Sequence, residues 1–126
     1  MMKKILIIED DASLLQAYRE MFKTQDVSVV GAASGQEGLT LVASEKPDII
    51  LLDIMLPGGM SGFDVLEKLK INPDTKQIPV IVLTNLDSEE KVAKAIGAKD
   101  YLVKANTTKD EIVKLVMDRL KSSKSA

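Results

Sequence analysis

Four short apolar runs in this sequence each end in polar residues that could bind a metal ion or react. The runs lie at residues 5–8, 49–52, 80–83 and 101–103, and the residues that follow them are Glu9-Asp10-Asp11, Asp53, Thr84 and Lys104. If the runs are parallel strands of one sheet, their carboxyl ends share one edge, which is where such sheets bind ligands. The polar side chains then converge on that edge.

The acidic residues of this group predict a metal site. Clustered carboxylates repel one another, so either one of them is protonated or a cation joins them. Oxygen ligands without sulfur or imidazole favour a hard cation. Mg²⁺ takes few protein carboxylates and completes its shell with water and phosphate oxygens. Two or three acids at an open edge match that preference.

The same group of residues suggests phosphoryl chemistry. A carboxylate can attack phosphorus and form an acyl phosphate, and a metal ion offsets the charge between the nucleophile and the incoming anion. Lys104 adds a positive charge and Thr84 a hydroxyl donor for phosphoryl oxygens. Taken singly, each residue has an ordinary explanation: a helix cap for Asp10 or Asp11, a turn for Asp53, a strand end for Thr84, and a solvated surface for Lys104.

The elements that must position these residues alternate along the chain. The runs at residues 5–8, 49–52 and 80–83 are continuous, which suits strands covered on both faces. Residues 27–30 and 101–103 are weaker strand candidates. Stripes of apolar residues at helical spacing separate the strands. The predicted caps of these helices are Ser34, Ser61 and Thr107 or Thr108.

We therefore expect an α/β fold of the (βα)5 type, with five parallel strands and right-handed crossovers. Two strand orders are common for such a pattern. The flavodoxin-like order 2-1-3-4-5, a three-layer sandwich, places strands 1 and 3 side by side at the switch point of the sheet. With that order, Glu9 and Asp10 lie beside Asp53.

Composition excludes several functions for these residues. The chain has 126 residues, 45% hydrophobic and 29% charged, with a net charge of −2. These values fit one globular domain and give no general attraction to nucleic acid or anionic lipid. Without cysteine or histidine, the chain offers no thiolate zinc site, no serine–histidine dyad and no phosphohistidine. No stretch approaches the ~20 apolar residues of a membrane span, and we expect a cytoplasmic protein.

The motifs in combination resemble a known family. Four segments are similar to those of the receiver domains of two-component response regulators. The segments are Lys-Ile-Leu-Ile-Ile-Glu-Asp-Asp at residues 4–11, Asp-Ile-Met-Leu-Pro at 53–57, the strand that ends in Thr84, and Asp-Tyr-Leu-Val-Lys at 100–104. The resemblance covers essentially the whole chain, and the segments stand in the family's order at similar spacing.

This resemblance implies that Asp53 is the phosphoacceptor. It also implies a site for Mg²⁺ (or Mn²⁺). Asp10, Asp53 and the backbone carbonyl of Met55 would be direct ligands of the ion, and Glu9 would act mainly through water.

Further roles follow from the same resemblance. Thr84 and Lys104 match residues that bind the phosphoryl group, and Tyr101 matches an aromatic residue that changes rotamer together with Thr84 when the domain switches. The implied donor is a sensor histidine kinase or a phosphotransfer protein, and the implied output is contact with an unknown protein target. The chain would be a switch rather than an enzyme, limited to its own phosphorylation and slow dephosphorylation. It would bind neither nucleic acid nor membranes.

The expected extent of this domain is residues 1–121, followed by a frayed tail at residues 122–126. We expect a stand-alone domain, either monomeric or weakly dimeric on phosphorylation.

Three segments depart from the family pattern. The loop that contains Gly58-Gly59 is one residue longer than usual. Ala105 stands where the family usually has proline after a cis peptide, and a cis bond before a non-proline residue costs ~3–4 kcal/mol, so we expect a trans bond after Lys104. The helix predicted at residues 88–95, little over two turns, is shorter than usual.

The departures leave a rival function open, namely a receiver-like protein-binding module with weak or lost phosphorylation. Leu86 and Met55 flank the implied phosphoryl site and cannot orient an attacking water, so for a working acceptor we predict slow self-dephosphorylation. A flavin electron carrier fits less well because acids follow the first strand. An aspartyl-phosphate phosphatase of the haloacid dehalogenase type fits less well because Met55 stands where its second aspartate would be.

Overall fold

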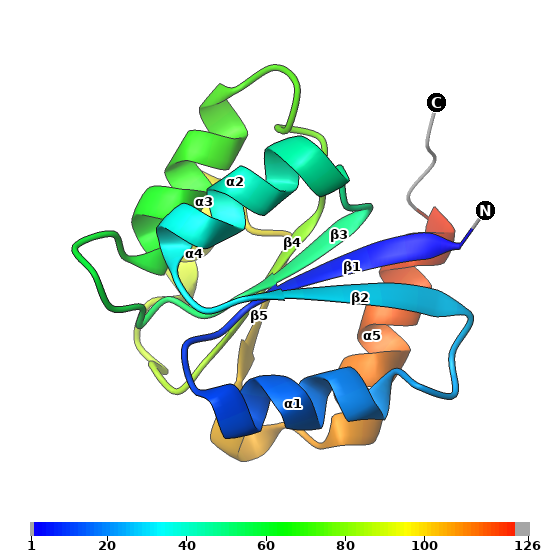
Figure 1. The fold of residues 1–126 in the computed structure, drawn as a ribbon. Helices are drawn as coiled ribbons and strands as arrows, with labels where there is room; N and C mark the ends of the chain where they lie inside the picture. Colours follow the sequence, from blue (N-terminus) through cyan, green and yellow to red (C-terminus); the bar gives the residue numbers. More distant parts are fainter. Residues whose placement is uncertain (1, 123–126) are drawn as a thin grey trace.

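The computed structural model describes residues 2–122 of the chain. Within these residues, five parallel strands form one sheet in the order β2-β1-β3-β4-β5, as expected from the sequence (Figure 1). The strands are β1 (Lys3–Ile8), β2 (Val27–Ala32), β3 (Ile49–Leu52), β4 (Val80–Thr84) and β5 (Asp100–Val103). Every residue of β3 and β4 is buried, because these strands have helices on both faces.

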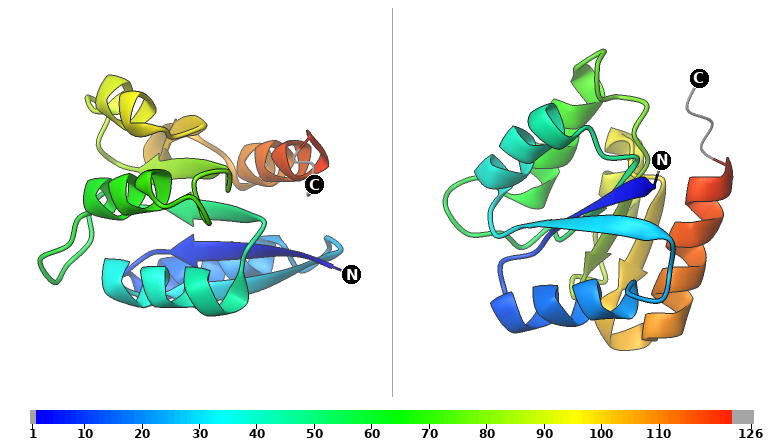
Figure 2. Two further views of the ribbon diagram at one scale, coloured as in Figure 1. Left: turned by 90° about the horizontal axis from the view of Figure 1, so that it is seen from above. Right: turned by 45° about the vertical axis from the view of Figure 1, so that its right-hand side comes forward.

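The helices form the outer layers of a three-layer sandwich. They are α1 (Ala12–Met21), α2 (Gly35–Glu45), α3 (Gly62–Ile71), α4 (Glu90–Ile96) and α5 (Lys109–Ser122), with a 3-10 turn at Lys104–Asn106. Helices α1 and α5 cover one face of the sheet, and α2, α3 and α4 cover the other (Figures 1 and 2). Alternate residues of a strand face opposite sides, so Ile5 packs with the first layer and Leu6 with the second.

Helix caps lie where the sequence predicts them. Ser34 caps α2 and Ser61 caps α3, where Asp64 completes a capping box. Of the two threonines proposed for α5, Thr108 is the cap, since its hydroxyl accepts from the N–H of Glu111. The adjacent Thr107 instead donates its hydroxyl to the carbonyl of Val103. The bonds of Ser34, Ser61 and Thr108 each occupy a backbone N–H that a helix start would otherwise leave unpaired.

Helix α4 differs from its predicted bounds. The sequence predicts residues 88–95, and the helix runs from Glu90 to Ile96. Its first residues lack a side-chain cap, so the turn before it does not join the helix. It ends at Gly97, whose φ of 138° only glycine adopts readily. The helix is two turns long, as expected, but displaced toward the C-terminus.

Other expectations have mixed outcomes. No peptide bond within residues 2–122 is cis, so the expected trans bond between Lys104 and Ala105 is confirmed.

Helix α5 extends through Ser122, the first residue of the predicted tail, and residues 123–126 lie outside the described part. The boundary of the domain stays a prediction. No helix in the described part is long and apolar enough to cross a membrane.

Candidate functional site

The carboxyl ends of β1 and β3 bring the predicted acids together. Ile8 pairs with Leu52 in the parallel ladder, so the residues that follow them, Glu9 and Asp53, are neighbours at one edge of the sheet. Carboxylate oxygens of Glu9, Asp10 and Asp53 all lie within 4.8 Å of one another. Glu9 and Asp53 are 3% and 6% exposed, whereas Asp10 is exposed to solvent. The cluster is therefore buried on one side and open on the other.

Lys104 provides the positive charge of the site. It begins the 3-10 turn after β5, and its Nζ lies 2.6 Å from Oε1 of Glu9 and 2.7 Å from Oδ2 of Asp53. The lysine side chain is 14% exposed, so these are short, largely desolvated charge-assisted hydrogen bonds. One lysine thus joins acids that lie 95 and 51 residues away in the sequence.

The protonation of the site follows from burial and from these bonds. Burial raises the pKa of Glu9 above its usual 4.5, although the hydrogen bonds from Lys104 and from the N–H of Asp11 lower it in part. Burial alone would lower the pKa of Lys104, but the hydrogen bonds to Asp53 and Glu9 outweigh it and raise the pKa above 10.5. The lysine is therefore charged at neutral pH.

The carboxylates differ in how many oxygens are already engaged. Both oxygens of Glu9 are used, one by Lys104 and one by the backbone N–H of Asp11 at 3.1 Å. Both oxygens of Asp53 also accept one bond each, from Lys104 and from the backbone N–H of Met55 at 3.0 Å. Within residues 2–122, the Asp10 carboxylate makes no hydrogen bond or ion pair, so it is the acid most available to an incoming cation. Asp11 instead caps α1, with Oδ1 accepting from the N–H of Leu14.

The backbone that carries Asp53 is held by a residue whose role sequence reasoning missed. The N–H of Gly62, the first residue of α3, donates to the carbonyl of Ile54 at 2.8 Å. A Cβ at Gly62 would stand 2.2 Å from the carbonyl oxygen of Asp53, so only glycine lets α3 pack this close. The available signal was a glycine directly after the cap Ser61, where helix propensity alone does not favour it.

The loop between β3 and α3 lies beside the site and is open. Gly58 and Gly59 both have positive φ angles, 86° and 81°. A Cβ at either would meet nothing within 4 Å, so conformation rather than crowding selects glycine here. The side chain of Met55 is 57% exposed. The predicted role of the Met55 carbonyl as a metal ligand stays a prediction.

Thr84 and Tyr101 are linked through the loop after β4. Thr84 ends β4 and is fully buried, and its hydroxyl oxygen accepts from the N–H of Leu86 at 3.4 Å. The hydroxyl of Tyr101 donates to the carbonyl of the same residue, Leu86. Within residues 2–122, the Thr84 hydroxyl makes no hydrogen bond to Asp53. The structure therefore places Thr84 at the carboxyl edge of the strand next to β3 and connects it to Tyr101 through the N–H and the carbonyl of one residue, Leu86.

Comparison with known proteins agrees with this arrangement. The family model of the response regulator receiver domain matches residues 5–117. The chain belongs to the response regulator receiver family. The receiver is 38% identical over 105 residues to protein PilH of Pseudomonas aeruginosa, with 82% of this chain and 86% of PilH covered.

Other relatives are longer or have been solved with metal. The receiver is 41% identical to the transcriptional regulatory protein AfsQ1 of Streptomyces coelicolor, over 82% of this chain but only 45% of that protein. It thus spans less than half of AfsQ1. Its fold matches a crystal structure of the Mn²⁺-bound form of response regulator Rcp1 with a TM-score of 0.78 and 29% identity, covering 98% and 96% of the two chains.

Proposed function

We propose that this receiver accepts a phosphoryl group on Asp53 in the presence of Mg²⁺ and acts as a phosphorylation-controlled switch. The observation that carries the proposal is the buried contact between Asp53 and Lys104 beside two further carboxylates. A buried carboxylate held by one lysine and one backbone N–H, at an open edge of the sheet, is placed to act as a nucleophile toward an incoming phosphoryl group.

The residues present fit a divalent ion. The cluster offers carboxylate oxygens only, with one exposed member, Asp10, on its open side, which suits a hard cation that keeps some of its water. Asp10 and Asp53 would hold the ion directly, with the carbonyl of Met55 as a further ligand, and Glu9 would act through water. When bound, the ion would neutralise charge between the carboxylates and the phosphoryl oxygens.

The transfer itself would exchange one phosphorus bond for another. A carboxylate oxygen of Asp53 forms a bond to phosphorus while the P–N bond of a phosphohistidine breaks, and the imidazole leaves with that electron pair. The product is an acyl phosphate. Lys104 already contacts the accepting carboxylate, so its ammonium can bind a phosphoryl oxygen without a large movement. The Thr84 hydroxyl would donate to another phosphoryl oxygen.

The same contacts suggest how phosphorylation would be read. When Thr84 turns toward the phosphoryl group, its present bond with the N–H of Leu86 is lost. The Tyr101 hydroxyl donates to the carbonyl of the same residue, so the loop and Tyr101 would respond together. This favours a shift between two existing conformations rather than a new structure.

The donor in this proposal is a sensor histidine kinase or a phosphotransfer protein, and the output is a protein contact rather than binding to nucleic acid. We further propose a stand-alone switch, monomeric or weakly dimeric when phosphorylated. PilH is covered over 86% of its length, whereas AfsQ1 is covered over 45%, so relatives of both lengths occur. The receiver would catalyse only its own phosphorylation and slow dephosphorylation. Its cytoplasmic location stays a prediction.

Phosphate-affinity electrophoresis after reaction with phosphoramidate tests the proposal. We expect a shifted band that requires Mg²⁺, disappears in EDTA and is absent in Asp53→Asn. Asp26→Asn, which alters an exposed carboxylate elsewhere, serves as the matched control and should shift like the wild type. If phosphoramidate gives no shift and beryllofluoride with Mg²⁺ also fails to bind, the receiver is a protein-binding module, the rival that its trans bond at Lys104 and short α4 favour.

A further inference from the structure

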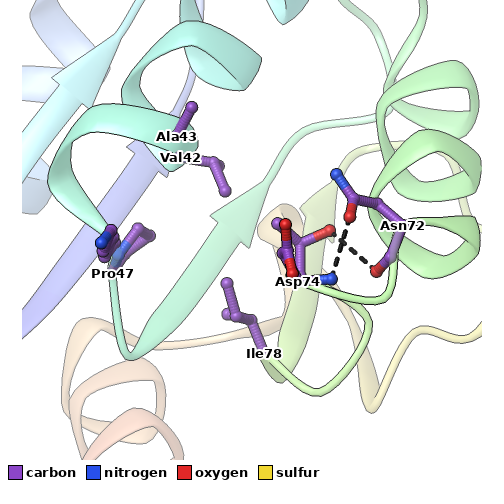
Figure 3. Close-up of a pocket in the computed structure, with 8 residues that line it drawn as sticks. Val42, Ala43, Pro47, Asn72, Asp74 and Ile78 are labelled. Atoms are coloured by element: carbon purple, nitrogen blue, oxygen red, sulfur yellow. Dashed lines mark hydrogen bonds between the residues drawn. The ribbon is translucent and has the colours of Figure 1, made fainter.

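A cavity lies away from the acidic cluster. This cavity of about 620 Å³ opens between the C-terminal end of α2 and the connection from α3 to β4 (Figure 3). Two of its residues, Pro47 and Ile78, stand just before the first residues of β3 and β4. The cavity is therefore near the amino ends of these strands, and the proposed phosphoryl site is at their carboxyl ends. Its volume lies in the range of about 300–1,000 Å³ typical of small-molecule sites.

The floor of the cavity is apolar. Val42 is 3% exposed, Pro47 is buried and Ile78 is half-buried. Figure 3 shows Val42 and Pro47 on one side of the space, Asn72 and Asp74 on the other, and Ile78 below Asp74. Such a floor offers a few apolar groups to one aliphatic side chain.

The wall formed by α2 carries one acceptor and one positive charge. The carbonyl of Ala43 cannot receive the usual helical hydrogen bond, because the residue four positions later is Pro47, which has no N–H. Lys46 ends the helix in the left-handed conformation, with φ of 48° and its N–H bound to the carbonyl of Val42. The Lys46 ammonium makes no ion pair within residues 2–122.

The opposite wall carries one donor and one negative charge. Oδ1 of Asn72 accepts from the backbone N–H of Asp74 at 2.9 Å, which leaves the amide N–H groups of Asn72 to other partners. The Thr75 hydroxyl donates to the carbonyl of Leu69 at 2.7 Å and anchors the turn. The carboxylate of Asp74 makes neither a hydrogen bond nor an ion pair within residues 2–122. Lys46 and Asp74, both exposed, thus bring opposite charges to the two sides of an apolar floor.

We propose that this cavity binds a small zwitterion, a free α-amino acid with an aliphatic side chain. The ligand's ammonium would pair with Asp74 and its carboxylate with Lys46. Ala43 and Asn72 would supply a neutral acceptor and a neutral donor, and the side chain would lie on the apolar floor. A simple amine or a simple carboxylate would satisfy only one wall and leave the other charge unpaired, so the zwitterion is the preferred class.

An NMR titration of the backbone amides of the full chain tests this with three probes of similar shape. The probes are L-leucine, 3-methylbutylamine, which lacks the carboxylate, and 4-methylpentanoate, which lacks the ammonium. We expect leucine to cause saturable shifts at residues 43, 46, 72 and 74. Each analogue should bind at least about tenfold more weakly, the equivalent of one lost charge-assisted contact of about 1.4 kcal/mol.

Variants locate the site and its charges. Asp74→Asn and Lys46→Met should each weaken leucine binding at least about fivefold, or about 1 kcal/mol. Asp26→Asn and Lys99→Met alter exposed charges elsewhere and should leave it unchanged. The amide spectra also report whether each variant is folded. The proposal is overturned if leucine gives no saturable shift, or if the amine binds as tightly as leucine. Phosphorylation of Asp53 is scored separately and does not bear on this outcome.

Discussion

Replacing Lys104 by methionine would test whether the buried ion pairs hold the acidic site together. The substitution keeps most of the side-chain volume but removes the charge that contacts Glu9 at 2.6 Å and Asp53 at 2.7 Å. Removing one partner of a buried pair typically costs about 3–5 kcal/mol, because the remaining charge stays buried without compensation. Protonation of Glu9, whose pKa burial already raises, would relieve part of that cost. We therefore expect a loss of about 2–3 kcal/mol at pH 7.

Urea unfolding followed by far-UV circular dichroism measures this loss, since the chain has no tryptophan. Lys94→Met is the matched control. It removes the same charge from an exposed pair with Glu90, in which the side chains are 49% and 54% exposed, and should cost less than about 0.5 kcal/mol. Both variants are compared with the wild type in EDTA and in Mg²⁺.

The two conditions separate the ion pair from the proposed metal site. In EDTA, equal losses for Lys104→Met and Lys94→Met would refute the claim that burial makes the Lys104 contacts strong. In Mg²⁺, the loss at Lys104 should shrink, because a bound cation supplies the missing positive charge. A loss that Mg²⁺ leaves unchanged would contradict a metal site among these carboxylates, whatever the effect in EDTA.

Four further predictions concern other contacts. Gly62→Ala should lower the free energy of unfolding in urea by about 2–3 kcal/mol, because its Cβ would meet the carbonyl of Asp53, whereas Gly58→Ala, whose Cβ meets no atom within 4 Å, should lower it by about 1 kcal/mol through its positive φ. Tyr101→Phe should cost about 1 kcal/mol and speed hydrogen exchange at residues 85–89; unchanged exchange would argue against the bond to Leu86. Leu86→Ala should accelerate loss of labelled phosphate from the proposed acyl phosphate, and an unchanged rate would count against shielding. Burial lowers the pKa of Lys70 below 10.5, so near that pH the Lys70 ammonium is protonated less often in the folded state than in the unfolded state. The free energy of unfolding should therefore rise as the pH increases toward 10.5. Lys70→Met should remove that rise relative to the wild type.

Local patterns in the sequence were sufficient for most of the fold. The continuous apolar runs predict β1, β3 and β4 because the stretches of these strands that are buried on both faces are apolar, apart from Thr84 at the end of β4. Ser34 and Ser61 predict helix starts because their hydroxyls can satisfy N–H groups only three residues away. Where that local signal is missing, as at Glu89 before α4, the predicted boundary was wrong by two residues.

The candidate site was predicted as a set of residues but not as a set of contacts. The sequence identifies Glu9, Asp53 and Lys104 as strand-end residues, and the parallel order implies that they share an edge. The Lys104 ammonium contacts both carboxylates because of the path that the chain takes after β5. The spacing of residues in the sequence does not predict that path.

Two features could be decided only by tertiary packing. Gly62 has no Cβ because α3 starts against the backbone of Asp53 and Ile54, and such a close approach is invisible to helix propensity. The cavity beside Pro47 and Asp74 arises where segments about 27 residues apart in the chain meet. What the sequence determined by itself was therefore the order of the elements, the starts of several helices and the chemical types at the strand ends, since these depend on neighbours within a few residues. What the tertiary structure decided were the pairings between distant side chains and the spaces between elements, since these depend on how the layers pack.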